Sequence, residues 1–140
     1  MMKLWRKIGV DKLLKRAGQQ GTILTGLSAG AICWHRWGHS DSMSFSAGDR
    51  PWSHIRVRSL DFIPYLYCPH LDGEKRHDSL AAMLRRDETA VACDNNAAIF
   101  YGPHGARCIT SRQRARTHIY HRSREGVVVR SYRDGETIDL

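Results

Sequence analysis

The first residues of the chain place apolar side chains at the spacing of an α-helix. Lysines and arginines occupy many of the positions between the apolar residues, which are Leu4, Ile8, Val10, Leu13 and Leu14. This pattern predicts one amphipathic helix over residues 3–17 that ends near Gly18.

A short β-branched run, Gly-Thr-Ile-Leu-Thr, follows at residues 21–25. Such a run is typical of a buried parallel strand. Residues 26–30 follow this run with two glycines around a serine, the composition of a tight turn. Residues 29–37 again have a helical composition. The predicted order is therefore helix, strand, tight turn, helix.

The rest of the chain alternates apolar runs with turn-forming residues. Residues 38–60 are rich in Ser, Asp, Gly, Pro and His and predict a loop, and residues 78–86 predict a helix. The predicted strands cover residues 63–68, 89–93, 97–101, 115–121 and 126–132. Asp94-Asn95-Asn96 is a good turn sequence between two of them, and we assign it no chemistry.

Composition limits the class of protein. The 140 residues are 41% hydrophobic and 26% charged, which predicts one soluble domain over residues 1–140. No apolar run is long enough for a membrane span, and charges interrupt the N-terminal residues where a signal peptide would be apolar. We therefore expect a cytoplasmic protein with no membrane partner.

The four cysteines are widely scattered and form no CxxC pair. Reduced thiols in or near the core are the expected state. The alternative is a zinc site at Cys33, His35 and His39, but a fourth ligand is not evident. We expect no metal and no organic cofactor.

The formal net charge of +8 permits binding to anions or nucleic acid. Basic and polar residues alternate with others over residues 112–122, which predicts a strand with one solvated basic face. A basic nucleic-acid-binding module is therefore one alternative function, although a solvated face needs no partner.

The glycine–serine turn matches the G-x-S-x-G pattern of a nucleophile elbow, with Gly26, Ser28 and Gly30 at its fixed positions. A serine between a strand and a helix adopts a strained backbone conformation that projects its hydroxyl, and the glycines remove side chains that would clash. Ser28 is the predicted nucleophile, and the Ala29 N–H is the predicted oxyanion donor. The alternative is a glycine-rich turn that contains a serine by chance.

An elbow serine needs a base and an orienting carboxylate. His70 directly follows a predicted strand, where active-site loops gather, and Asp41 lies in the loop after the elbow helix. We predict His70 as the base and Asp41 as its partner. The alternatives are a turn-capping role for Asp41 and a structural role for His70.

Four motifs in order resemble those of the peptidase E family, which includes the aspartyl dipeptidases and is related to the cyanophycinases. They are Gly26-Leu27-Ser28-Ala29-Gly30-Ala31-Ile32-Cys33-Trp34, His39-Ser40-Asp41-Ser42, Phe62-Ile63-Pro64 and Cys68-Pro69-His70. The resemblance implies catalytic roles for Ser28, His70 and Asp41. It also implies hydrolysis of short peptides with an N-terminal aspartate, through an acyl-enzyme on the serine.

Gly73-Glu74-Lys75-Arg76 is similar to the family segment that recognises the acidic side chain. The resemblance thus makes Arg76, with Glu74 beside it, the candidate substrate-binding residues, since an arginine fork grips a carboxylate with two hydrogen bonds. The alternative for Arg76 is a surface charge at a helix start.

The family resembles class I glutamine amidotransferases in fold, which implies an α/β protein. We expect a three-layer α/β/α sandwich with a mainly parallel sheet, truncated at its N-terminal side, and with antiparallel C-terminal strands. Because exposed strand edges associate, the missing portion implies a partner chain, for which we expect a homodimer, or else a rearranged sheet or instability. A second hypothesis is an impaired family member that acts as a binding or regulatory subunit.

Overall fold

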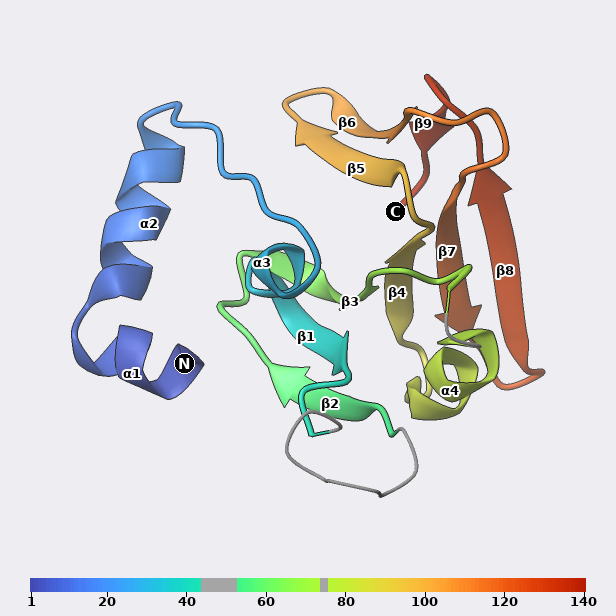
Figure 1. Cartoon of the computed structure of the whole chain (residues 1–140), viewed down its shortest axis with the longest axis horizontal. Helices are drawn as coiled ribbons and strands as arrows, with labels where there is room; N and C mark the ends of the chain where they lie inside the picture. The colour runs from blue at the N-terminus through green and yellow to red at the C-terminus, as the bar shows by residue number, and fades with distance from the viewer. Residues whose placement is uncertain (44–52, 74–75) are drawn as a thin grey trace.

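A computed structural model describes residues 1–43, 53–73 and 76–140 of the chain (Figure 1). Its main feature is a six-stranded sheet with the order β2-β1-β3-β4-β7-β8. The strands are β1 (His35–Ser40), β2 (Ile55–Arg58), β3 (Ile63–Cys68), β4 (Thr89–Cys93), β7 (Thr117–Arg122) and β8 (Val127–Tyr132). The protein is therefore an α/β protein, as predicted.

The direction of the strands differs from the prediction. Strand β3 pairs in parallel with β1 and with β4, whereas β1–β2, β4–β7 and β7–β8 are antiparallel. A second, wholly antiparallel sheet contains β5 (Ala97–Gly102), β6 (Gly105–Thr110) and β9 (Thr137–Ile138). The expectation of a mainly parallel sheet is wrong, because the described strands form one mixed and one antiparallel sheet.

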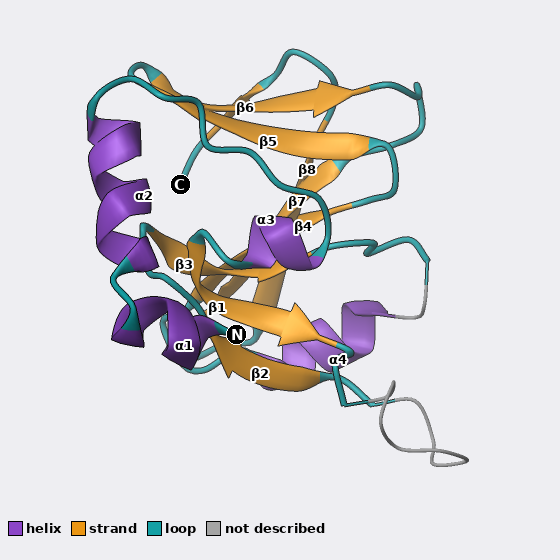
Figure 2. Ribbon diagram, turned by 60° about the vertical axis from the view of Figure 1, so that its left-hand side comes forward, coloured by secondary structure: helices purple, strands orange, loops and turns teal. Residues whose placement is uncertain are grey.

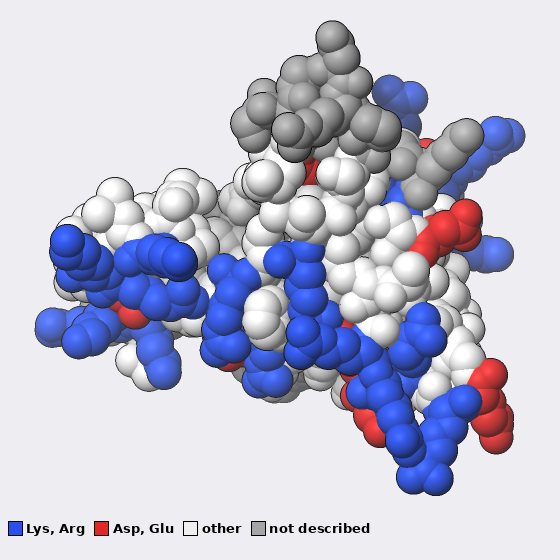
Figure 3. Space-filling view, turned by 90° about the horizontal axis from the view of Figure 1, so that it is seen from below, with Lys and Arg blue, Asp and Glu red and all other residues white. Residues whose placement is uncertain are grey.

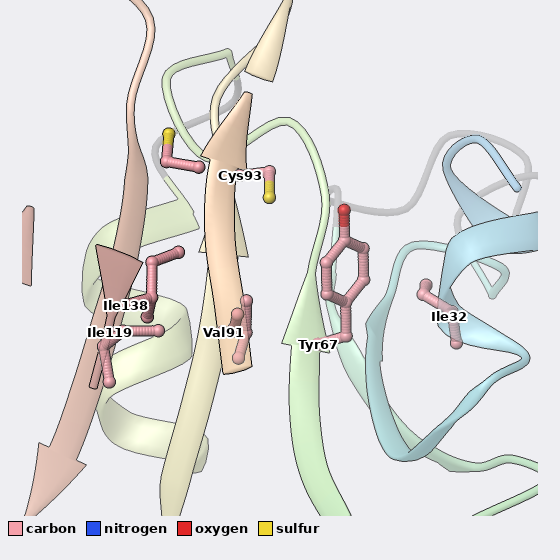
Figure 4. Close-up of a cluster of buried hydrophobic side chains, with 8 residues drawn as sticks. Ile32, Tyr67, Val91, Cys93, Ile119 and Ile138 are labelled. Atoms are coloured by element: carbon pink, nitrogen blue, oxygen red, sulfur yellow. The ribbon is translucent and has the colours of Figure 1, made fainter. Parts of the chain in front are cut away.

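Both faces of the six-stranded sheet are buried at its centre. Because successive residues of a strand point to opposite faces, Leu66 and Ala90 pack with Leu80 of α4 (Arg76–Met83) on one face. Tyr67 and Val91 point to the opposite face. There they join a cluster that includes Ile32, Cys93, Ile119 and Ile138 (Figure 4).

The layers follow from these two clusters. Helix α4 covers one face, while residues of the second sheet and of α3 (Ala29–Ile32) cover the other (Figures 1 and 2). One outer layer is therefore partly a β-sheet rather than only helices. This arrangement differs from the α/β/α sandwich that we expected.

The N-terminal helix of the prediction is two helices. Helices α1 (Met2–Lys7) and α2 (Val10–Gln19) meet at Gly9, whose φ of +80° is left-handed and ends a helical path. Neither helix has a buried residue, and Leu4, Ile8 and Leu13 are 56%, 61% and 66% exposed. The two helices lie to one side of the sheet in Figure 1.

The predicted helix over residues 29–37 stops at Ile32, and β1 begins at His35. Strand β1 pairs with β2 on one side and with β3 on the other, so sheet hydrogen bonds replace the helical ones. A Cβ on Gly38 would lie 2.2 Å from Ile32 Cγ2, so this glycine lets α3 lie close against β1. The loop predicted over residues 38–60 contains the end of β1 and all of β2, and residues 44–52 lie outside the described chain.

The other predicted elements are confirmed within a few residues. They are β3, β4, β5, β7, β8 and α4. The turn at residues 94–96 is also confirmed, and its Asn96 has a φ of 66°. Strands β6 and β9 were not predicted. All four cysteines are free and buried, as expected, and no described helix is long and apolar enough to cross a membrane.

The basic strand face predicted over residues 112–122 is wrong in two respects. Strand β7 begins only at Thr117, and Tyr120 on the predicted solvated face is 3% exposed. Arg122 turns inward and donates from Nη2 to the carbonyl oxygen of Ala81 at 2.6 Å.

Positive charge gathers elsewhere on the surface. Lysine and arginine side chains cross one side of the molecule, as Figure 3 shows. At the edge of the sheet, three guanidinium groups lie over the ring of Trp37, at 4.4 Å for Arg56, 5.2 Å for Arg58 and 5.9 Å for Arg85. Arg56 is in addition paired with Glu88, so both a carboxylate and the Trp37 ring stabilise positive charge at this edge.

Candidate active site

Ser28 has the strained backbone that a nucleophile elbow requires. Its φ of 52° and ψ of −117° lie outside the regions that L-residues ordinarily occupy. Helix α3 begins at the next residue, and the Ser28 side chain makes no capping hydrogen bond to it. A strained conformation of this kind costs about 1–3 kcal/mol and is typical of functional positions.

The two glycines of the motif differ in what they contribute. A Cβ on Gly26 would lie 2.1 Å from the Gly30 carbonyl oxygen and 2.8 Å from the Ala31 nitrogen, so any other residue would open the turn. A Cβ on Gly30 would have no described atom within 4 Å. The predicted steric role is therefore confirmed for Gly26 and not for Gly30.

The strand predicted before the elbow is wrong. Residues 22–26 have no regular secondary structure, and no backbone hydrogen bond joins residues 23–26 to another described residue. Ile23 and Leu27 are 83% and 82% exposed, while Leu24 contacts Gly18 of α2. A strand exists only with a partner strand, and the described chain supplies none here.

The N–H groups at the start of α3 are mostly used. Gly30 N–H donates to the Leu27 carbonyl at 2.8 Å, and Ala31 N–H donates to the Ser28 carbonyl at 3.0 Å. The N–H of Ala29 has no backbone acceptor among the described residues. It is therefore the donor available beside the Ser28 hydroxyl, at the position predicted for the oxyanion.

His70 lies just beyond β3, as predicted, with a φ of 54°. Its Nδ1 is 2.7 Å from Asn95 Oδ1, and Asn95 donates from its backbone N and its Nδ2 to Asp72 Oδ1 at 2.7 and 2.9 Å. Since Nδ2 of Asn95 is the donor to Asp72, Oδ1 is the carbonyl oxygen and accepts from Nδ1–H of the histidine. The neutral ring then leaves Nε2 unprotonated, which is the form that a general base needs.

Asp41 has a different partner from the one predicted. Its Oδ2 lies 2.8 Å from Nη2 of Arg76, whose side chain is 1% exposed. The predicted Ser28–His70–Asp41 relay is thus not the hydrogen-bond pattern of the structure, and no hydrogen bond joins Ser28 to His70 in the described chain. Arg76 is a buried ion-pair partner and not a surface charge, and Glu74 lies outside the described residues.

The three residues of the alternative zinc site lie in separate polar clusters. His35 contacts the Ala31 carbonyl and the Tyr101 hydroxyl, each at 3.0 Å, whereas His39 Nε2 is 2.8 Å from Ser79 Oγ. Burial lowers the pKa of each of these histidines to about 4, and burial raises the pKa of the Cys33 thiol to about 11. Within the described ranges no group of three His, Cys, Asp or Glu side chains fits a metal ion.

Sequence reasoning missed Asn95 and Asp72 as the residues that orient His70. Asp72 lies two residues after the histidine, but Asn95 lies 25 residues away in a turn. The sequence Asp94-Asn95-Asn96 indicates only the turn, so the signal for a histidine partner was absent.

The described residues thus include a serine with a strained backbone, an Ala29 N–H without a described backbone acceptor, and a histidine whose Nδ1 lies 2.7 Å from an amide oxygen. The family model of "Peptidase family S51" matches residues 1–109. The chain therefore belongs to peptidase family S51.

Among curated proteins, the chain is similar to "Uncharacterized peptidase YgaJ" of Bacillus subtilis (strain 168). The two are 34% identical over 104 residues, which are 72% of this chain and 42% of the relative. The chain thus spans less than half the length of that relative. No solved structure matches the chain.

Proposed function

We propose that this chain is a serine peptidase that hydrolyses short peptides, with a preference for an N-terminal aspartate, through an acyl-enzyme on Ser28. The observation that carries the proposal is the φ of 52° and ψ of −117° at Ser28, with the hydroxyl not used as a helix cap. A strained serine at the start of a helix has no structural purpose that a glycine would not serve at lower cost. Membership of peptidase family S51 supports the same chemistry.

His70 is the general base of this mechanism. It takes the proton of the Ser28 hydroxyl on Nε2 as the oxygen attacks the peptide carbonyl, and it returns that proton to the leaving amine. Asn95 and Asp72 hold the ring in the required tautomer. Hydrogen bonds of this kind are often long before substrate binds, so the separate positions of Ser28 and His70 are compatible with this role.

The N–H of Ala29 stabilises the oxyanion, and Arg76 recognises the aspartate side chain. Because the guanidinium of Arg76 is already paired with Asp41 at 2.8 Å, a substrate carboxylate shares or displaces that partner. Asp41 therefore acts on the specificity of the site through Arg76 in this proposal. In this mechanism Asn95, and not Asp41, orients the ring of His70.

The test compares the purified chain with its Ser28→Ala variant on an aspartyl p-nitroanilide. We expect the rate to fall by about 10³-fold or more, because the nucleophile is lost and the fold is not. Ser111→Ala is the matched control, since Ser111 is an exposed serine far from the elbow in sequence. Equal rates for the native chain and Ser28→Ala would overturn the proposal.

An Asn95→Ala variant tests the role of His70. Without its acceptor, the ring loses its fixed tautomer, and we expect kcat to fall by about 10²-fold, with a smaller change in KM. A change confined to KM would show that Asn95 acts in binding rather than in orienting the base.

A second candidate function is an inert relative that acts as a binding or regulatory subunit, and the exposed flank of the elbow favours it. Ile23 and Leu27 are more than four-fifths exposed, and residues 23–26 make no backbone hydrogen bond within the described chain, so this surface suits a covering partner such as a second copy of the chain. This candidate predicts a folded dimer by analytical ultracentrifugation with no turnover of the aspartyl substrate. Turnover that depends on Ser28 would exclude it.

A further inference from the structure

A second serine–histidine–aspartate cluster lies on the β7–β8 hairpin, outside the elbow region. His118 of β7 and Ser131 of β8 are directly opposite in the antiparallel register. Ser131 Oγ is 2.8 Å from Nδ1 of His118, and Nε2 of the same ring is 3.2 Å from Asp94 Oδ1. One imidazole thus bridges a hydroxyl and a carboxylate.

The carboxylate of this cluster is held in place by the backbone. Asp94 Oδ2 accepts from the Arg116 N–H at 2.9 Å, and the Asp94 N–H donates to the Arg116 carbonyl at 3.0 Å. Oδ1 is therefore directed to His118 and accepts from its Nε2–H, since a carboxylate only accepts. The neutral ring then accepts the Ser131 proton on Nδ1, so His118 is in the tautomer of a general base.

The three side chains of the cluster differ in their exposure to solvent. The His118 and Asp94 side chains are 12% and 10% exposed, whereas Ser131 lies exposed on the edge strand β8. An accessible hydroxyl within hydrogen-bond reach of a base, with the base oriented by a third group, is the arrangement typical of nucleophilic catalysis.

A second histidine lies beside the cluster. The His77 ring of α4 is 6.1 Å from the His118 ring, at an interplanar angle of 79°. The Tyr120 hydroxyl is 2.5 Å from Nδ1 of His77, and burial raises the pKa of this tyrosine to about 12.

We propose that Ser131, His118 and Asp94 form a second nucleophilic centre that hydrolyses small carboxylic esters. Ser131 Oγ bonds to the acyl carbon while its proton passes to Nδ1 of His118. The C–O bond to the alcohol then breaks, and the alcohol leaves with that proton. Water attacks the acyl-serine by the same route and releases the acid and free Ser131.

The position of Ser131 on an exposed edge strand sets the substrate class. Little binding energy is available there to activate a poor leaving group, so the substrates are short-chain esters with a good one, such as phenyl esters. The centre does not depend on the proposed elbow chemistry, since Ser131, His118 and Asp94 are all distinct from the residues of the elbow mechanism.

The test uses a fluorophosphonate, which a nucleophilic serine attacks with loss of fluoride, followed by peptide mass spectrometry of the full chain. We expect a label on Ser131 in the native protein and in Ser28→Ala, and none on the exposed control Ser111. Asp94→Asn should lower the labelling rate at Ser131 by about 10²-fold, because the base loses its orienting group. The rate of p-nitrophenyl acetate hydrolysis should also be lower in Ser131→Ala than in the native protein.

The label on Ser131 is measured in the native protein, so this result does not depend on whether any variant folds. Folded protein with no label on Ser131 would overturn the proposal. An unchanged rate in Asp94→Asn would also overturn it, because the cluster would then only satisfy polar groups across two strands. Loss of peptide hydrolysis in Ser28→Ala with the Ser131 label intact would separate this centre from the elbow site.

Discussion

The elbow segment, residues 21–31, and the centre of the six-stranded sheet differ in side-chain burial and in backbone hydrogen bonding. At the centre, Leu66, Ala90 and Val91 are 0% exposed and lie on strands that pair on both sides. In the elbow segment, Ile23 and Leu27 are more than 80% exposed, and residues 23–26 make no backbone hydrogen bond within the described chain.

The contrast shows that strain and stability reside in different parts of this protein. The unfavourable φ of Ser28 closely follows residues 23–26, which make no backbone hydrogen bond within the described chain. The same turn brings Gly26 so close to Gly30 that a Cβ on Gly26 would lie 2.1 Å from the Gly30 carbonyl oxygen. The sheet supplies the folding free energy, and the elbow carries a conformation that the sheet does not need.

The largest expected effect is on stability at the centre of the sheet. Leu66→Ala should lower the free energy of unfolding by about 3–5 kcal/mol, because it removes buried methyl groups and leaves a cavity. Leu27→Ala, in the exposed elbow, should change it by less than about 0.5 kcal/mol. Urea unfolding followed by circular dichroism measures both variants. Similar losses would show that the elbow segment is packed in solution.

A smaller effect distinguishes the two glycines of the elbow. A Cβ at Gly26 would clash with backbone, so Gly26→Ala should move Ser28 and lower kcat/KM on an aspartyl p-nitroanilide by about 10²-fold. Gly30→Ala is the matched control, because its Cβ would meet no described atom within 4 Å. If both variants kept full activity, the turn would not set the position of the nucleophile.

The smallest effect concerns His35, which links the elbow helix to the second sheet. Its ring contacts the Ala31 carbonyl at the elbow helix and the Tyr101 hydroxyl of the second sheet. Burial lowers its pKa from 6.5 to about 4, so between these values the unfolded chain binds a proton that the folded chain does not. Stability is therefore full above pH 6.5 and falls as the pH drops toward 4, by about 2 kcal/mol at pH 5.

The His35→Gln variant should lose that part of the pH dependence. Its unfolding free energy should fall by about 2 kcal/mol less than that of the native chain between pH 7.5 and 5. His104→Gln, at an exposed histidine, should follow the native curve. Parallel curves for all three proteins would show that His35 is not buried in the neutral form.

Features that depend on residues close together in the sequence could be predicted. The conformation of Ser28 depends on the residues within two positions of it, and the motif predicted it correctly. The apolar runs at β3 and β4 were equally clear. The segment before the elbow failed because a strand needs a hydrogen-bonded partner, and its β-branched residues cannot show whether one is present.

The sequence by itself determined the class of the chain, the position of most strands and the strained serine, because local sterics and side-chain periodicity decide these. Only the tertiary structure decided the direction of the strands and the partners of the polar side chains. His70 pairs with Asn95 and Asp41 with Arg76, across 25 and 35 residues of chain. Such pairs depend on how the sheet brings distant turns together, which no short pattern of residues encodes.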